Sequence, residues 1–416
     1  MLASTMSCCD AKFCGERRLV DISSKTYTQT IEKKDLKFMK RKCKNVDITD
    51  LDLIKDCIHR CLKKKKKTRT DIVRLFDTYG DIDNVALVLQ KELSCRQLDL
   101  VPIWYRTIYD VGSQKARVIG IQDIKQQIYD YIAVAGLSEL IAGLGKYQCA
   151  SLPDRGQIYG ALAIHRWLSE KHNGKYRINY VCKFDIRKYY ESIPQDTIIA
   201  WLEKRVKNEH LMWLIKTLIR TFKKGLSIGS YLSQYLGNLF LMDVYHKIQE
   251  RSYRVRHKRN GTIQRVNLIY KTLFYMDDLF IAGSNSKDMM RAAEILEKEM
   301  RTKGLDLKDS WRCFKIDDDD FVDMMGFKIY RDHITIRRKT FRHIRRAVTK
   351  FRRAPNSVTN AKTLLSYKGL LEHSDSQQYL KSNNLFALFK KARKVVSKYD
   401  KTKILQENAK CADVYV

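Results

Sequence analysis

The most informative stretch of the sequence is Leu273-Phe274-Tyr275-Met276-Asp277-Asp278-Leu279-Phe280-Ile281. Two apolar, β-prone runs flank a pair of adjacent acids, which predicts a β-hairpin with Asp277 and Asp278 near its tip. A third acid, Asp185, ends another apolar strand at residues 180–184. Burying an unpaired carboxylate is costly, so these acids are expected to converge and share cations. Carboxylate oxygens favour Mg²⁺, and two such ions can clamp the attacking and leaving oxygens of a phosphoryl transfer.

The spacing of several segments resembles that of reverse transcriptases. Tyr275–Asp278 is similar to their Tyr-x-Asp-Asp box, and Phe184–Tyr190 is similar to their first palm motif, an Asp followed five residues on by an aromatic residue. Ile228–Gln234, Gly304–Lys308 and Met325–Phe327 occupy the places of three further motifs. Five elements in the family's order over residues 115–330 are far more specific than the four-residue box alone.

The resemblance implies an α+β, right-hand polymerase with a ferredoxin-like palm, fingers before it and a helical thumb after it. We expect a basic helical N-terminal extension at residues 1–95, fingers at 96–175, a palm at 176–330 and the thumb at 331–416. Within the palm region, residues 251–270 carry Asn260-Gly261 between two alternating runs, a strong hairpin signal. Residues 195–221 have helical spacing, and Asp317–Asp320 is expected to be a solvated turn.

The resemblance also implies roles at the catalytic centre. Asp185 and Asp277 would be the main ligands of two Mg²⁺ ions, or of Mn²⁺, with Asp278 beside them and the carbonyl of Ile186 touching the nucleotide-side ion. Tyr190 would be the steric gate, whose ring excludes a 2′-hydroxyl and so selects deoxynucleotides. Without its spacing from Asp185, Tyr190 would be read as a packed core aromatic.

Further residues are carried over to substrate binding. Lys115 and Arg117 match the cations that hold the incoming triphosphate, and Lys308 is the preferred motif lysine, with Trp311 and Arg312 as competing positions. The other nucleotide-binding candidates are Gly229 and Gln234, and the primer grip is assigned to Met325, Gly326 and Phe327.

The charge of the chain indicates a polyanionic partner. There are 80 Lys and Arg against 47 Asp and Glu, a net charge of +33, with a pI near 9.7. Nucleic acid is the first candidate and an acidic membrane the second. Basic zones lie at 33–44 with 63–67, at 251–265 and at 337–353. The RNA-binding candidates are Lys63, Lys64, Lys65, Lys66, Lys67, Arg155, Arg337, Arg338, Arg342, Arg345 and Arg346.

One departure from the family pattern bears on function. Many reverse transcriptases carry Gln-Gly between the two Asp motifs, where this chain has Ile228-Gly229. Loss of that Gln removes a polar contact beside the nucleotide and template base, a change similar to that in mutagenic retroelement enzymes and in bacterial defence-associated reverse transcriptases. The wider resemblance is to bacterial and phage enzymes of the group II intron and retron superfamily.

The leading hypothesis is an RNA-directed DNA polymerase that copies a dedicated structured RNA in antiviral defence. Its expected partners are a non-coding RNA template, a primer or cDNA strand, deoxynucleotides and an accessory protein, with no membrane. A diversity-generating retroelement polymerase is the close alternative, and a non-catalytic RNA-binding protein on the same fold is a second. Eleven irregularly spaced cysteines, read as reduced thiols, favour the cytoplasm.

Overall fold

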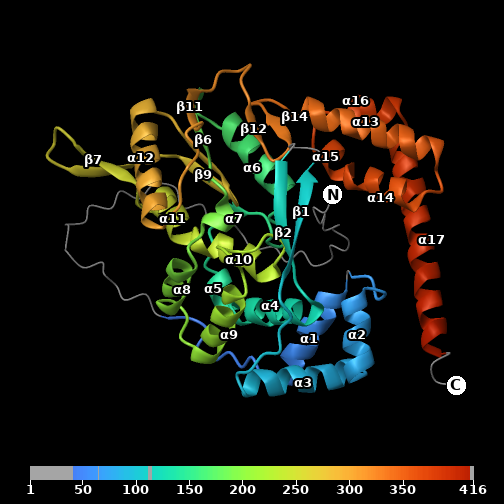
Figure 1. Ribbon diagram of the computed structural model, residues 1–416. Helices are drawn as coiled ribbons and strands as arrows, with labels where there is room; N and C mark the ends of the chain where they lie inside the picture. The colour runs from blue at the N-terminus through green and yellow to red at the C-terminus, as the bar shows by residue number, and fades with distance from the viewer. Residues whose placement is uncertain (1–40, 64, 111–114, 413–416) are drawn as a thin grey trace, which may run out of the picture. The chain divides into compact units, whose positions relative to one another are not determined.

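The computed structural model describes residues 41–63, 65–110 and 115–412, with only the backbone of residues 110, 115 and 403–412 (Figure 1). Contacts group the described chain into two units, one of residues 41–156 and 179–315, the other of residues 157–178 and 316–412. Most of the basic zone at 33–44, and Lys64, lie outside the described residues. No described helix has the length and apolar character needed to cross a membrane.

The first unit begins with three short helices, α1 (Leu51–Leu62), α2 (Thr70–Tyr79) and α3 (Ile82–Ser94). Asp50 and Asp81 cap the first and third by accepting hydrogen bonds from Asp52 N and Asn84 N. Buried apolar residues of α1 and α2 pack against α4 (Ile124–Gly136), and those of α3 pack against α1 and α2. The helical character predicted for this region is confirmed for its described part.

The lysine run after α1 is partly structural. Lys65 is half-buried and donates a hydrogen bond to the side chain of Gln127 on α4. Arg69 donates to the carbonyl of Gln122 at 3.0 Å. Lys63, Lys66 and Lys67 are exposed.

A five-stranded sheet forms the centre of the first unit, with the order β11-β6-β10-β9-β3. Its strands are β3 (Gln148–Cys149), β6 (Tyr180–Asp185), β9 (Lys271–Tyr275), β10 (Asp278–Gly283) and β11 (Arg312–Lys315). All neighbours are antiparallel except β3 and β9. The predicted hairpin is β9–β10, and Phe184, Phe274 and Phe280 are fully buried in these strands. Helix α12 (Ser286–Thr302) packs against the sheet.

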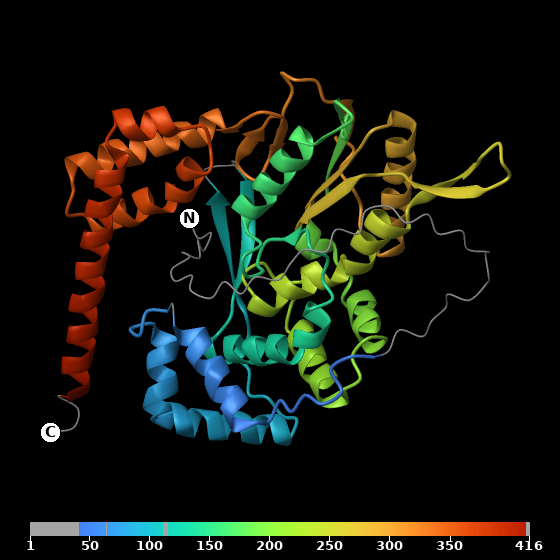
Figure 2. The same ribbon diagram turned by 180° about the vertical axis from the view of Figure 1, so that it is seen from behind.

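Two further strand pairs belong to this unit. β1 (Trp104–Asp110) pairs with β2 (Lys115–Ile121), and β7 (Tyr253–His257) pairs with β8 (Ile263–Asn267), each antiparallel. Gly261 at the second turn has a φ of +77°, which favours glycine. Figures 1 and 2 show the β7–β8 hairpin extending beyond α12. The hairpin predicted at 251–270 is therefore confirmed.

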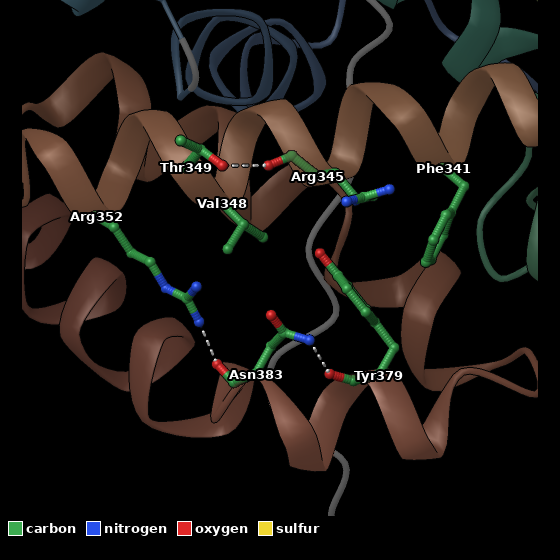
Figure 3. Close-up of a pocket in the computed structure, with 7 residues that line it drawn as sticks. All are labelled: Phe341, Arg345, Val348, Thr349, Arg352, Tyr379 and Asn383. Carbon is green, nitrogen blue, oxygen red and sulfur yellow. Dashed lines mark hydrogen bonds between the residues drawn. The ribbon is translucent and has the colours of Figure 1, made fainter.

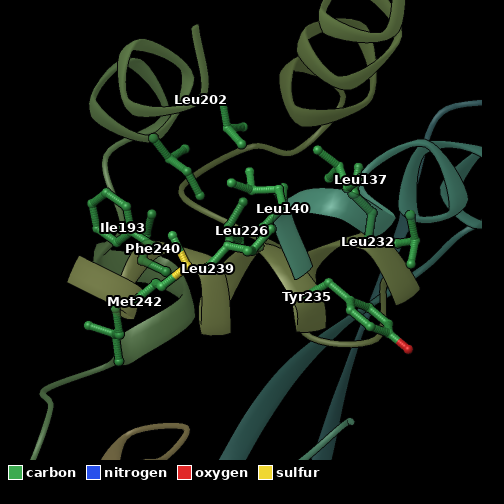
Figure 4. Close-up of a cluster of buried hydrophobic side chains, with 14 of the residues drawn as sticks. Leu137, Leu140, Ile193, Leu202, Leu226, Leu232, Tyr235, Leu239, Phe240 and Met242 are labelled. Carbon is green, nitrogen blue, oxygen red and sulfur yellow. The ribbon is translucent and has the colours of Figure 1, made fainter. Parts of the chain in front are cut away.

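The remaining helices of this unit form a packed layer. They are α5 (Ser138–Ile141), α7 (Tyr189–Ser192), α8 (Gln195–Glu203), α9 (Glu209–Arg220), α10 (Tyr231–Phe240), α11 (Met242–His246) and a π-helical turn at Lys247–Arg251. Figure 4 shows Leu140, Leu202, Leu239 and Phe240 meeting in one apolar cluster between them.

The helical spacing of residues 195–221 is divided between two helices, α8 and α9. The first helix ends at Glu203. Lys42 N then donates to Arg205 O, and Lys207 N donates to Lys42 O, which forms a short parallel β-bridge. Asn208 then starts α9 by accepting a hydrogen bond from Leu211 N at 2.8 Å. Apolar periodicity continues across the break because both helices bury the same kind of face.

The second unit contains α6 (Gln157–Ser169), the strand pair β4 (Lys171–His172) and β5 (Lys175–Tyr176), and a three-stranded sheet of β12 (Val322–Met324), β13 (Phe327–Ile329) and β14 (Ile334–Ile336). Buried Arg331 ties these parts together by donating to the carbonyls of Leu168, Ile178 and Ile316. The acids at 317–320 form an exposed turn, as predicted.

The C-terminal part of this unit is helical. Its helices are α13 (Arg338–Arg353), α14 (Val358–Ser366), α15 (Lys368–Glu372), α16 (Gln377–Ser382) and α17 (Leu385–Ala412). Together with the strands of the first unit, these helices confirm the α+β content expected from the sequence.

One expectation about the cysteines is wrong. Cys182 of β6 and Cys313 of β11 lie directly opposite each other and form a disulfide. The two residues are 131 positions apart, so the sequence offered no local signal for the pair. The described cysteines that remain free include Cys43, Cys57, Cys61 and Cys149, all buried.

Candidate active site

The β9–β10 hairpin brings the acidic pair to the end of β6. Met276 at its tip has a φ of +54°, a left-handed conformation that makes the turn tight. Asp278 lies directly opposite Asp185 in the sheet register, and Ile186 N donates to the carbonyl of Asp277 at 3.0 Å. The three acids predicted from the sequence are therefore neighbours.

The carboxyl groups of Asp185 and Asp278 share a hydrogen bond. Burial raises the pKa of Asp278 to about 7, and the adjacent charge of Asp185 adds to this effect. Burial also acts to raise the pKa of Asp185, but hydrogen bonds from Asp278 and Lys308 outweigh it and lower that pKa. The hydrogen bond between the two groups reduces the repulsion between two close carboxyl groups.

Three cations oppose the negative charge of the cluster. Lys308 Nζ lies 3.2 Å from Asp185 Oδ1, and Lys308 N donates to the carbonyl of Asp185 at 2.8 Å. Burial raises the pKa values of Asp277 and Asp278. The charge of Lys183 acts against this rise at Asp278, and the charge of Arg117 acts against it at Asp277. Of the competing motif positions, Trp311 packs on Phe184 with ring centroids 5.0 Å apart, and Arg312 pairs across the sheet with Lys183. Lys308 is thus the motif cation that reaches the acids.

The donor set fits a divalent cation, although no three acidic, His or Cys side chains of the described residues already surround a common point. The carboxyl groups of Asp185 and Asp278 lie within hydrogen-bonding distance of each other and offer hard oxygen donors. A cation bound between them would neutralise the charge of both groups. Asp277 adds a third carboxylate close enough for the charge of Asp185 to raise its pKa.

Tyr190 lies beside this cluster. Its hydroxyl is 3.8 Å from Met276 Sδ at the hairpin tip, and burial raises its pKa. A Cβ added to Gly237 of α10 would come within 3.8 Å of the Tyr190 ring. Tyr189, in contrast, is fully packed and donates its hydroxyl to the carbonyl of Gly237 at 2.7 Å. Tyr189 is therefore the core aromatic, whereas Tyr190 remains partly exposed next to the acids.

The segment between the Asp motifs forms a turn that opens α10. Gly229 has a φ of +109°, and a Cβ there would lie 2.8 Å from the carbonyl of Gly120 on β2. Gly120 N donates to the carbonyl of Ile228 at 3.0 Å. Ser230 then caps α10 by accepting from Ser233 N. Gly229 is thus required by backbone geometry, and Gln234 lies in the first turns of the helix.

A family model described as reverse transcriptase (RNA-dependent DNA polymerase) matches residues 108–329, more than half of the chain. This chain belongs to the reverse transcriptase family. Apo telomerase from Candida tropicalis is similar in structure, with a TM-score of 0.45 and 15% identity over 73% of this chain and 58% of that one. The same telomerase truncated from its C-terminal domain gives a TM-score of 0.40 and 13% identity, over 56% of this chain and 54% of that one. The chain thus spans a little over half of these structures, and no curated protein sequence matches it.

Other predicted residues of this reverse transcriptase lie in several places. Arg155 donates to the carbonyl of Gly145 at 2.9 Å and so supports its own loop. Met325 and Gly326 form the turn between β12 and β13 with φ values of +54° and +85°, and Phe327 is buried in the second unit. The Lys115 side chain and all of Lys64 are outside the described residues. Arg337 pairs with Asp323, while Arg338, Arg342, Arg345 and Arg346 are exposed along α13.

The sequence reading missed Asp130. This acid is fully buried on α4, where Oδ2 accepts hydrogen bonds from Ser230 Oγ at 2.7 Å and Leu232 N at 3.3 Å. It therefore holds the start of α10 by hydrogen bonds to Ser230 and Leu232. A lone acid within the apolar run Ile128–Val134 of the reverse transcriptase was the available signal.

Proposed function

We propose that the chain is an RNA-directed DNA polymerase that extends a primer with deoxynucleotides along a dedicated structured RNA. The observation that carries this proposal is the convergence of Asp185, Asp277 and Asp278 at one end of the sheet, with Lys308 on Asp185 and Tyr190 beside the hairpin tip. A binding protein that had lost catalysis would have no need to hold the half-buried acids Asp185 and Asp278 next to a third acid, Asp277, at such cost.

The residues divide the work of nucleotidyl transfer. Asp185, Asp277 and Asp278 would hold two Mg²⁺ ions, or Mn²⁺, which supply charge stabilisation to the transferring phosphoryl group. The primer 3′-oxygen forms a bond to the α-phosphorus, and the bond from that phosphorus to the bridging oxygen breaks as pyrophosphate leaves. Lys308 and Arg117 place positive charge where phosphate charge develops.

Tyr190 supplies selection of the sugar. Its hydroxyl lies 3.8 Å from Met276 Sδ and its ring lies near Gly237, so the side chain occupies space beside the hairpin tip. A 2′-hydroxyl would have to displace the ring, whereas a deoxyribose would not. The product is therefore DNA.

The biological role depends on which RNA the enzyme copies and on how accurately it copies that RNA. We assign the enzyme to antiviral defence, since Ile228 in place of a Gln and the three helices before the fingers are features of a specialised polymerase. Error-prone copying in a diversity-generating retroelement is the alternative that the same Ile228 supports.

The decisive experiment replaces Asp277 by Ala. Primer extension on an RNA template should fall by at least about a thousandfold, because the residue acts on the transition state. RNA affinity and thermal unfolding should remain those of the wild type. Asp319→Ala, a change in the exposed acidic turn, is the matched control and should extend normally. Extension by purified Asp277→Ala at the wild-type rate would refute the proposed function.

A further inference from the structure

A pocket of about 450 Å³ lies in the helical part of the second unit, between α13 and α16. Five of its seven lining residues follow one stripe of α13, at spacings of three, four and seven, as neighbours on one face of a helix do. Tyr379 and Asn383, four residues apart, close the other side (Figure 3). The α13 residues are Phe341, Arg345, Val348, Thr349 and Arg352.

The lining combines cations with aromatic rings and contains no acid. Phe341 and Tyr379 meet edge to face with centroids 4.9 Å apart. Burial raises the pKa of Tyr379, and the charges of Arg345 and Arg352 act against that rise, so both guanidinium groups lie near the phenol. Arg352 donates to the carbonyl of Asn383 at 2.7 Å, which fixes its position at one end. Figure 3 shows the side-chain oxygen of Asn383 pointing into the cavity.

This chemistry favours a ligand that is both anionic and aromatic. A guanidinium group forms paired hydrogen bonds with phosphate oxygens, and an aromatic side chain provides a face for stacking a base. A purely apolar ligand would desolvate two cations without replacing their hydrogen bonds. The volume lies within the range of ligand pockets, about 300–1,000 Å³, and accepts one nucleotide but not a duplex.

The nucleotide must be unpaired. In a duplex, both faces of each base are covered by neighbours, and only phosphates and sugars reach a helix that follows the backbone. The exposed arginines of α13 outside the pocket, Arg338, Arg342 and Arg346, suit that backbone contact. Tyr379 and Asn383 lie across the cavity from α13, on the side where a base that has left the stack would lie.

We propose that this pocket captures one unpaired nucleotide of the bound nucleic acid, with its phosphate on Arg345 and Arg352 and its base against Tyr379. The inference rests on the proposed function for the presence of nucleic acid. It goes beyond that function because it assigns the helical unit a preference for a bulged strand over a perfect duplex.

The test measures affinity of the full-length protein for two RNA hairpins, one fully paired and one with a single bulged 2-aminopurine. Wild type should prefer the bulged hairpin, and 2-aminopurine fluorescence should fall on binding as the base stacks. Tyr379→Leu should lower the affinity for the bulged hairpin by about tenfold to a hundredfold and leave that for the paired hairpin unchanged. Tyr379→Phe, which keeps the ring, should behave as wild type and shows that the pocket still folds.

Charge is tested separately with neighbouring arginines. Arg345→Gln should reduce the preference for the bulged hairpin over the paired one. Arg353 is exposed on the same helix but outside the pocket, so Arg353→Gln should lower the affinity for both hairpins equally. A bulged DNA hairpin distinguishes product from template as the source of the nucleotide. Equal affinity for paired and bulged hairpins, with unchanged fluorescence, would overturn the inference, while normal primer extension in the same preparation would leave the proposed function intact.

Discussion

Replacement of Asp130 by Asn should make the protein more stable at alkaline pH. Asp130 is fully buried, and burial raises its pKa from 3.8 to about 6, although hydrogen bonds from Ser230 and Leu232 oppose the rise. Its Oδ1 atom has no hydrogen-bond partner among the described residues. Ionising this carboxyl group therefore costs free energy in the folded state that the unfolded chain does not bear.

The magnitude follows from the difference between the two pKa values. About two pKa units correspond to about 3 kcal/mol at 1.36 kcal/mol per unit. Because the folded-state pKa is raised, this stability is present below pH 3.8 and is lost as the pH rises through about 6. An Asn at this position still accepts hydrogen bonds from Ser230 and Leu232 but never ionises. The difference in unfolding free energy, variant minus wild type, should therefore rise by about 2 kcal/mol between about pH 4.5 and about pH 8.

Urea unfolding followed by circular dichroism at these two pH values measures the difference. Asp154→Asn, the same change in an exposed loop, is the control that separates loss of a buried charge from loss of any carboxylate. A difference that stays constant with pH, or that falls as the pH rises, would refute the assignment of a buried, protonatable Asp130.

Two further predictions concern substrate binding. Tyr190→Ala should raise the ratio of ribonucleotide to deoxynucleotide incorporation by about tenfold to a hundredfold, measured by single-nucleotide extension, because the ring no longer fills the sugar space. Tyr189→Phe should leave that ratio unchanged, and an unchanged ratio in Tyr190→Ala would make Tyr190 a packing residue only. Changing Lys63, Lys66 and Lys67 to Gln, with half-buried Lys65 kept, should reduce the slope of log affinity for the cognate RNA against log salt by about 2. Generic primer extension should change little; an unaltered slope would contradict an RNA-binding role for this segment.

The sequence predicts the β9–β10 hairpin well because its signals are local. Asp277 and Asp278 between apolar runs demand a turn with buried flanks, and the strand ending at Asp185 supplies a partner of matching length. Asn260-Gly261 likewise sets its own hairpin through backbone conformation. In each case neighbouring residues carry enough information to fix the local structure.

Other features depend on contacts between distant residues. The break between α8 and α9 is set by a bridge to Lys42, more than 160 positions away, and the Cys182–Cys313 disulfide by strand order in the sheet. The partial burial of Lys65 depends on Gln127 of α4. A run of lysines looks uniform in the sequence, but packing assigns its members to different tasks.

The turn at Ile228–Gly229 shows how these distant contacts bear on copying. Gly120 N donates to the carbonyl of Ile228, the backbone of β2 leaves no room for a Cβ at Gly229, and Asp130 accepts hydrogen bonds from Ser230 and Leu232. The course of the backbone is therefore fixed by its neighbours and not by the side chain of Ile228, which is only half-buried. A Gln at this position would leave the turn in place and change only what the side chain presents. The change in copying accuracy that we propose for Ile228 would then arise from the polar contact that it lacks, since the backbone that positions α10 does not depend on it.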